Sequence, residues 1–120
     1  MKPMGAIPPG FSADVHGRLC VAGIDCDSLV AEAGDTPVFI YDFGLVRARI
    51  AALRAAMPAR LRIHYAIKAN PMPALVSAIA PLVDGLDVAS GGELAIATPA
   101  HAHVSFAGPG KRDDELEAAI

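Results

Sequence analysis

The sequence predicts an α/β fold in which parallel strands alternate with helices, and three observations support this class. From residue 60 the chain alternates three times between a short β-prone run and a helical stretch, a rhythm typical of parallel strands joined by right-handed crossovers. Hydrophobic residues make up 53% of the 120 residues, and the mean hydropathy is +0.42, so the chain has enough apolar surface for a buried core. The helical stretches also place apolar residues three and four positions apart, which is the spacing of one helix face.

The net charge of −3 and the isoelectric point of about 5.7 argue against several classes of function. No basic stripe is present, so we expect no nucleic-acid partner. No apolar run reaches the roughly 18 to 20 residues of a membrane helix, so we expect no membrane partner. The two cysteines predict idle thiols in a reducing, cytoplasmic compartment, and no metal site. No metal-ligand spacing links the cysteines or the histidines, which are Cys20, Cys26, His16, His64, His101 and His103.

The N-terminal part of the chain predicts little regular structure at first. Residues 1–17 are rich in proline and glycine and predict an irregular lead-in. Leu19–Ile24 is a short β-prone stretch. Asp27 or Ser28 is expected to cap a short helix that Gly34 ends.

A strand and a long helix are expected next. Val38–Tyr41, after the turn Asp35–Pro37, is β-branched and aromatic and predicts a strand. Asp42 is a good N-cap, and Pro58 marks the end of the helix that follows. One face of this helix carries four apolar residues, which are Val46, Ile50, Leu53 and Met57.

Three further β-prone runs predict the strands of the parallel sheet. They are Arg62–Ile67, Leu86–Ala89 and His103–Ala107. Because the carboxyl ends of parallel strands lie at one edge of a sheet, we expect residues that follow these runs to meet there.

Helices are predicted between and after these strands. One begins near Met72, and Pro81 is expected to bend it or end it early. A short helix begins at Gly92 or Glu93, and another begins at Arg112 with acidic residues in its first turn.

Lys68 is the first candidate for chemistry, because it directly follows the run Arg62–Ile67. Alternation along a strand puts it on the same side as His64 and the small Ala66. A lysine at the mouth of a barrel strand is partly desolvated, which frees its amine as a nucleophile. The alternative is an exposed lysine where a strand gives way to a loop.

Two more strand ends carry unusual residues. Asp87 lies in an otherwise apolar run, and a carboxylate there needs a partner or a function. The turn Ser90–Glu93 contains two glycines, which allow a ligand close to the backbone, and N–H groups at the helix start that could hold an anion. Gly108–Lys111 lacks the spacing of a phosphate-binding Walker loop. Each of these turns is also compatible with an ordinary strand-to-helix connection.

Four segments together resemble a known family, the pyridoxal-phosphate decarboxylases of the diaminopimelate, ornithine and arginine type. The resemblance extends over about residues 18–120, and its lysine motif followed by DVASGGEL is the most specific part. The first of the four has aspartate where the family has glycine. The segments are DTPVFIYD (35–42), YAIKANP (65–71), GLDVASGGEL (85–94) and SFAGPGK (105–111).

The resemblance implies a fold as well as a chemistry. Members of the family have an eight-stranded barrel followed by a β-domain. This chain would then contain the first three strand–helix units of a TIM-type (β/α) barrel, preceded by an N-terminal β segment. The implied domains are an irregular lead-in at 1–17, a segment at 18–41 that pairs with the C-terminal β-domain, and an incomplete pyridoxal-phosphate-binding barrel domain at 42–120.

The resemblance also implies the roles of particular residues. Lys68 would be the catalytic residue and would hold pyridoxal 5′-phosphate as a Schiff base. An amino-acid substrate would displace it and lose its α-carboxylate as carbon dioxide. Asp87 and Glu93 would line the cofactor side near Lys68 and tune its protonation, and Ser90 would shape that wall. The full-length protein would be a homodimer.

Two alternatives to an amino-acid decarboxylase stay open. One is a non-catalytic, truncated module that binds the cofactor or a partner. The other is a barrel of the amino-acid racemase type, against which the DVASGGEL segment argues. We expect the 120 residues to be the N-terminal part of a larger enzyme, inactive alone, and the sequence does not identify the amino acid.

Overall fold

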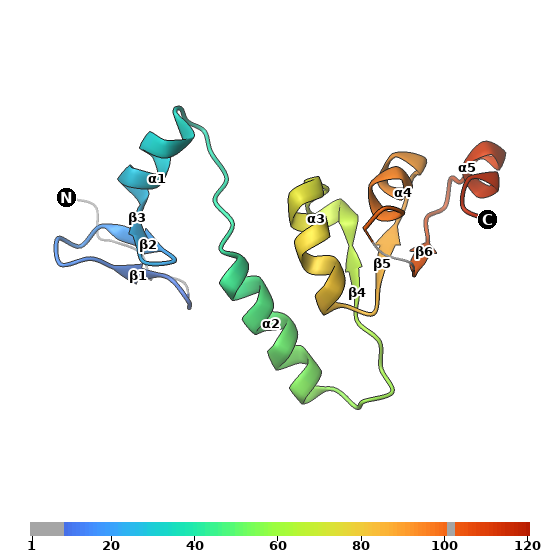
Figure 1. Ribbon diagram of the computed structural model, residues 1–120, viewed down its shortest axis with the longest axis horizontal. Coiled ribbons are helices and arrows are strands. Elements are labelled where there is room, and N and C mark those ends of the chain that lie inside the picture. The colour runs from blue at the N-terminus through green and yellow to red at the C-terminus, as the bar shows by residue number, and fades with distance from the viewer. Residues whose placement is uncertain (1–8, 101–102) are drawn as a thin grey trace. The chain divides into compact units, whose positions relative to one another are not determined.

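The computed structural model describes residues 9–100 and 103–120. Figure 1 shows its elements. The chain divides into two compact units, Met1–Val46 and Arg47–Ile120, and each is described by itself. His101, one of the histidines considered above, lies outside the described residues.

The first unit contains a small antiparallel sheet of order β1-β2-β3, made of Ser12–Ala13, Leu19–Val21 and Ile24–Asp25. The β-prone stretch 19–24 therefore forms two strands rather than one, because the chain reverses in its middle. Ala22 and Gly23 have φ angles of 52° and 81°. Two consecutive positive φ values form the tight loop that joins antiparallel strands. β1 also lies within the stretch predicted to be irregular.

Helix α1, Cys26–Ala33, follows β3 directly. Its N-cap is Asp25, whose carboxylate accepts hydrogen bonds from Ser28 N at 3.1 Å and Ser28 Oγ at 2.8 Å. The prediction of a cap at Asp27 or Ser28 is wrong, because the N-cap lies two to three residues earlier, at Asp25. Gly34 ends the helix as predicted, with a φ of 88° that suits glycine.

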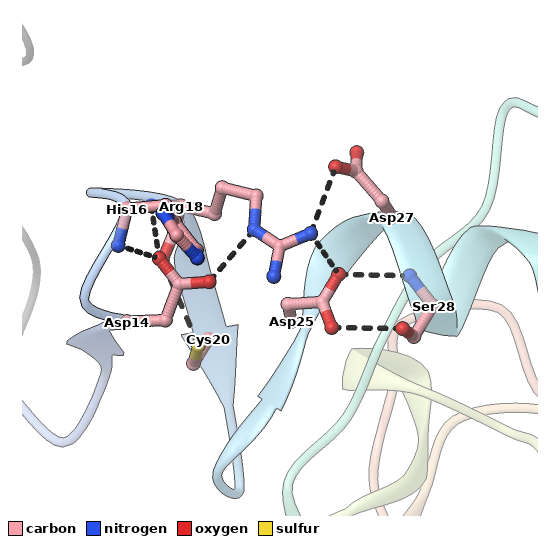
Figure 2. Close-up of polar contacts among 7 residues, drawn as sticks. All are labelled: Asp14, His16, Arg18, Cys20, Asp25, Asp27 and Ser28. Carbon is pink, nitrogen blue, oxygen red and sulfur yellow. Dashed lines mark hydrogen bonds and ion pairs between the residues drawn. The ribbon is translucent and has the colours of Figure 1, made fainter.

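Figure 2 shows an ion cluster around Arg18 that the sequence did not reveal. Arg18 Nε donates to Asp14 Oδ2 at 2.7 Å, and its Nη1 lies 3.5 Å from Asp25 and 3.9 Å from Asp27. Asp14 Oδ1 also accepts from the backbone N–H groups of Arg18 and His16. These bonds, that from Arg18 N first, lower the pKa of Asp14 below its ordinary value. The cluster therefore joins the β1–β2 turn to the start of α1.

Val38–Tyr41 is not a strand, so this prediction is wrong. Strand propensity needs a neighbouring strand to pair with, and none of the other described residues pairs with this segment. Its side chains remain accessible, with Phe39 86% and Tyr41 50% exposed.

Helix α2, Phe43–Ala56, begins and ends close to the predicted positions. The Asp42 carboxylate accepts from Gly44 N at 2.7 Å, as expected of an N-cap, and the helix stops before Pro58. None of its residues is buried. The predicted apolar face is therefore at most partly covered in this structure.

The second unit is built on a parallel sheet, as predicted, of order β4-β5-β6. Its strands are His64–Ala66, Gly85–Val88 and Val104–Phe106. β4 and β6 are shorter at both ends than predicted, while β5 is displaced by one residue. β4 gives way at Ile67–Ala69 to the 3₁₀ turn η1.

The Asp84 carboxylate bonds to the residue just before β4. Ile63 N donates to Asp84 Oδ2 at 2.7 Å, and Asp84 N donates to Ile63 O at 2.8 Å. Arg54 of α2 donates to the same carboxylate oxygen. The hydrogen bond from Arg54, followed by that from Ile63 N, lowers the pKa of Asp84 to about 2. Because the Asp84 side chain bonds to the backbone of Ile63, β4 starts at the residue after Ile63, which is His64.

Three helices accompany the sheet: α3 (Pro73–Ile79), α4 (Gly91–Ala97) and α5 (Asp113–Glu117). Pro81 lies in the 3₁₀ turn η2, Ala80–Leu82, directly after α3. This confirms that Pro81 ends the helix early. α4 and α5 each begin within two residues of the predicted start.

The sheet has one apolar face and one polar face, because side chains alternate along each strand. α4 lies against β5 and β6 and also touches α3. The apolar face and these helices form the core, whose largest fully buried side chains are Ile67, Val76, Ile79, Leu86 and Val88. The polar residues considered below come from the opposite face.

Candidate functional site

The carboxyl ends of the three parallel strands meet at one edge of the sheet. Ala66 is paired with Asp87, and Asp87 is paired with Ser105. Lys68 and Ala107 follow at the ends of β4 and β6. The prediction that Lys68, Asp87 and Ala107 share this edge is therefore confirmed.

Lys68 lies in η1 and is exposed. We expected partial desolvation, which this structure contradicts, because η1 carries the residue past the last strand pair. The turn after it is fixed by Tyr65 Oη, which donates to Asn70 O at 3.1 Å, and by Met72 N, which donates to Asn70 Oδ1 at 3.0 Å. Within residues 9–100 and 103–120, the Lys68 amine has no hydrogen-bond or ion-pair partner.

Lys111, the other lysine of the described residues, differs in this respect. Its Nζ donates to Gly108 O at 3.0 Å and lies 5.7 Å from the centroid of the Phe106 ring. This amine is therefore held against its own loop. Lys111 serves as a natural comparison for Lys68.

Asp87 lies half-buried on the polar face of β5. Its Oδ1 accepts a hydrogen bond from Ser105 Oγ at 2.8 Å, and Ser105 Oγ lies 3.3 Å from His64 Nδ1. The His64 ring meets that of His103 edge-on, with centroids 5.2 Å apart. Sequence reasoning identified Asp87 but missed Ser105, although alternation along β6 puts Ser105 on the Asp87 face.

The turn Ser90–Glu93 is closed by its own side chains. Ser90 is the N-cap of α4, and its Oγ accepts from Glu93 N at 3.2 Å. Glu93 Oε2 in turn accepts from Ala89 N at 2.8 Å. Ser90 and Glu93, which the sequence places at the cofactor side only as an expectation, therefore hold the backbone of this turn in place.

An anion does lie at the start of α4, as the sequence suggested, but it belongs to the protein itself. Glu115 Oε1 accepts from Gly91 N at 2.7 Å, and its Oε2 accepts from Arg112 N at 3.0 Å. The bond from Arg112 N, followed by that from Gly91 N, lowers the pKa of Glu115. Sequence reasoning missed Glu115, whose only signal was its place in an acidic first helical turn.

In the part of the chain that the structure describes, no three His, Cys, Asp or Glu side chains gather as metal ligands. Over the same ranges, no helix is long and apolar enough to cross a membrane. Both cysteines are free, with Cys20 buried and Cys26 partly so.

Comparison with known proteins decides which family this arrangement belongs to. Residues 43–120 match the pyridoxal binding domain of pyridoxal-dependent decarboxylases. The chain belongs to this family. The match confirms the resemblance inferred from the sequence, and pyridoxal as the cofactor of these decarboxylases.

Individual relatives of the chain carry the names of different decarboxylases. The diaminopimelate decarboxylase of Aquifex aeolicus is 37% identical over 107 residues, covering 87% of this chain and 25% of the relative. The 2-[(L-alanin-3-ylcarbamoyl)methyl]-2-hydroxybutanedioate decarboxylase of Staphylococcus aureus is 32% identical over 96 residues, covering 78% of this chain and 24% of that enzyme. A crystal structure of a protein from Aquifex aeolicus, titled AQ1208, matches with a TM-score of 0.83 and 34% identity, covering 94% of this chain and 28% of that one.

These matches confirm the predicted α/β partial barrel. They also show that the chain spans about a quarter of the length of the curated relatives it matches.

Proposed function

We propose that this chain is the N-terminal part of a pyridoxal-phosphate-dependent amino-acid decarboxylase and that Lys68 binds the cofactor covalently. The observation that carries the proposal is the Lys68 amine. It is exposed at the carboxyl edge of three parallel strands, without a partner among the described residues. Lys111, by contrast, is engaged with Gly108 and Phe106.

The residues at this edge fit a pyridoxal group in their chemistry. Covalent attachment needs a primary amine that is accessible and not tied up in an ion pair, and Lys68 meets both conditions. The neighbouring strand ends carry the small side chains of Ala66, Ala89 and Ala107. A carboxylate, that of Asp87, lies one strand away on the polar face.

The roles of the chain's own residues follow from their positions. When bound, pyridoxal phosphate serves as the electron sink for the bond that breaks at the α-carbon. Lys68 binds through Nζ, which must lose its proton to act as a nucleophile. Asp87 supplies a carboxylate on the polar face of the neighbouring strand. Ser90 and Glu93 keep the backbone of residues 89–93 in a fixed conformation beside it.

The substrate, assembly and compartment are parts of the same proposal. We propose an amino acid that loses its α-carboxylate, in a homodimer located in the cytoplasm. The two free thiols are consistent with that compartment, since cytosolic thiols stay reduced. The two relatives act on different molecules by their names.

Borohydride trapping on the full-length protein tests the central assignment. The protein loaded with pyridoxal phosphate should show an absorbance band in the visible or near ultraviolet that borohydride bleaches, leaving the label on Lys68. Lys68→Ala should lose both the band and carbon dioxide release from amino acids, because residues 9–100 and 103–120 contain no other unengaged lysine amine.

The matched control is Lys111→Ala, which removes a lysine that is already held by its loop and should keep the band. A label on any other lysine would overturn the assignment of Lys68. A normal band without carbon dioxide release from any amino acid would support the non-catalytic alternative instead.

A further inference from the structure

We propose that Ser105 and His64 are positioning residues for Asp87. A series of hydrogen bonds across three strands fixes the orientation of the Asp87 carboxylate at the cofactor edge. The series runs from His64 on β4 through Ser105 on β6 to Asp87 on β5. This inference rests on the proposed function, because it concerns the carboxylate assigned there to the cofactor side.

The register of the sheet brings these three side chains to one face. His64 pairs with Gly85, and Asp87, two residues further along β5, pairs with Ser105. Since alternate residues share a face, His64, Asp87 and Ser105 all project from the side opposite the buried Leu86. Each strand of the parallel sheet thus contributes one member.

The hydroxyl group of Ser105 determines which group donates in each of these hydrogen bonds. A serine hydroxyl has one proton to donate. Its oxygen lies 2.8 Å from Asp87 Oδ1 and 3.4 Å from Leu86 O, and a carboxylate is the stronger acceptor. The proton therefore goes to Asp87, and a lone pair of Ser105 Oγ faces the His64 ring.

This direction of donation fixes the tautomer of His64. At 3.3 Å from a Ser105 oxygen that can only accept, His64 Nδ1 must carry a proton. A neutral His64 is therefore the Nδ1–H tautomer, with Nε2 unprotonated.

The surroundings of His64 hold its ring in this position. His103 meets it edge-on at 5.2 Å between centroids. Gly85 lies beneath the two rings, and a Cβ there would be 2.8 Å from His64 Cε1 and 2.9 Å from His103 Cδ2. The absence of a side chain at Gly85 is thus what admits the ring that supports Ser105.

As a consequence, the two oxygens of the Asp87 carboxylate have different surroundings. Oδ1 is occupied by Ser105, while Oδ2 has no hydrogen-bond partner in the described ranges. One oxygen is therefore held and the other is left for a partner at the cofactor edge. Without Ser105 the carboxylate could turn between several rotamers, and its charge would no longer be fixed in direction.

Nuclear magnetic resonance of the full-length protein with ¹⁵N-labelled histidine tests this series of hydrogen bonds directly. Long-range proton–nitrogen correlations distinguish the two tautomers, and the His64 signals are assigned by their loss in His64→Asn. We expect Nδ1–H at His64 in the native protein and in Ser105→Thr, which keeps the hydroxyl. Ser105→Ala should release the ring from this tautomer. An Nε2–H tautomer in the native protein, or no change in Ser105→Ala, would overturn the proposal.

Kinetics on the loaded enzyme test the consequence for catalysis. Loss of a hydrogen bond to a charged group predicts a fall in kcat of about 10- to 100-fold in Ser105→Ala, with little change in KM. Ser105→Thr should restore most of the rate. His64→Asn, whose amide nitrogen replaces Nδ1, should retain more activity than His64→Leu. A changed tautomer with unchanged kcat in Ser105→Ala would overturn the positioning role.

The two proposals fail in different ways. The tautomer measurement needs no cofactor, so the series of hydrogen bonds can be refuted while borohydride still labels Lys68. Conversely, a label elsewhere would refute the proposed function and leave the tautomer result intact. His16→Asn is the matched control, since His16 lies on an exposed turn of the other unit and should alter neither measurement.

Discussion

Gly85 shows how a single residue controls the polar face of the sheet. It is buried at the start of β5, beneath the two histidine rings. Its backbone also approaches the neighbouring strand closely, because an added Cβ would lie 2.9 Å from His103 O. Ring atoms can shift by rotation, but a backbone oxygen in a paired strand cannot move without disturbing the sheet.

Gly85→Ala is therefore predicted to destabilise the protein by about 1–3 kcal/mol, the usual cost of overpacking a close-packed site. Urea denaturation measures this free energy of unfolding. Gly92→Ala is the control, because the nearest atom to its added Cβ is Ser90 Oγ at 3.9 Å and alanine favours the helix by about 0.5–1 kcal/mol. Equal stability of the two variants would refute the argument.

At the residue scale, the sequence predicts a site residue when its signal is local. Lys68 was identified because it follows a β-prone run, and Asp87 because it interrupts an apolar one. Glu115 carried no such signal, since its partner Gly91 is 24 residues away. The role of Ser105 likewise depends on the pairing of β5 with β6, which only the folded sheet supplies.

Asp84 joins two elements of the second unit. Its carboxylate accepts from Arg54 of α2 and from Ile63 N just before β4. These bonds lower its pKa from the ordinary 3.8 to about 2. A carboxyl whose pKa is depressed by folding stabilises the folded state above its unfolded pKa, and this contribution is lost as the pH falls through the folded value.

The stability advantage of the native protein over Asp84→Asn is therefore predicted to be constant from neutral pH down to about 5. It should shrink between about pH 4 and pH 2. Urea denaturation of both proteins across this range measures the difference. Asp113→Asn is the control, because it removes an exposed carboxylate in the first turn of α5 that makes no bonds like those of Asp84 to any described residue. An advantage that grows as the pH falls would show that the sign is wrong.

At the element scale, the sequence predicted which elements exist better than where they end. The three parallel strands were found, because each is a short β-prone run between helical stretches. Their limits were missed where a side chain competes with the ladder, as Asp84 does at Ile63. The hairpin within 19–24 was missed because Ala22, with its positive φ, is not a residue that usually marks a turn.

At the scale of the whole molecule, the arrangement of the sheet was predictable because chain connectivity allows few alternatives. Strand–helix–strand units in one sheet are almost always parallel and right-handed. The strand predicted at Val38–Tyr41 was wrong for a different reason. That segment has the composition of a strand, but a strand exists only when another segment pairs with it, and no described residue does so here.

This segment leads to a prediction about self-association. An extended apolar segment with unpaired backbone groups is a template for pairing with another chain. Phe39, its most exposed side chain, is 86% accessible. We expect the 120-residue chain to associate as its concentration rises, and Phe39→Asp to shift it toward the monomer, because a buried charge opposes pairing.

Val15→Asp should have no such effect. Val15 is 95% exposed but lies in the tight turn between β1 and β2, where no extended edge is available. Sedimentation velocity across a range of concentrations measures the distribution. A native chain that stays monomeric throughout, or two variants that behave alike, would show that Val38–Tyr41 is not the surface through which copies associate.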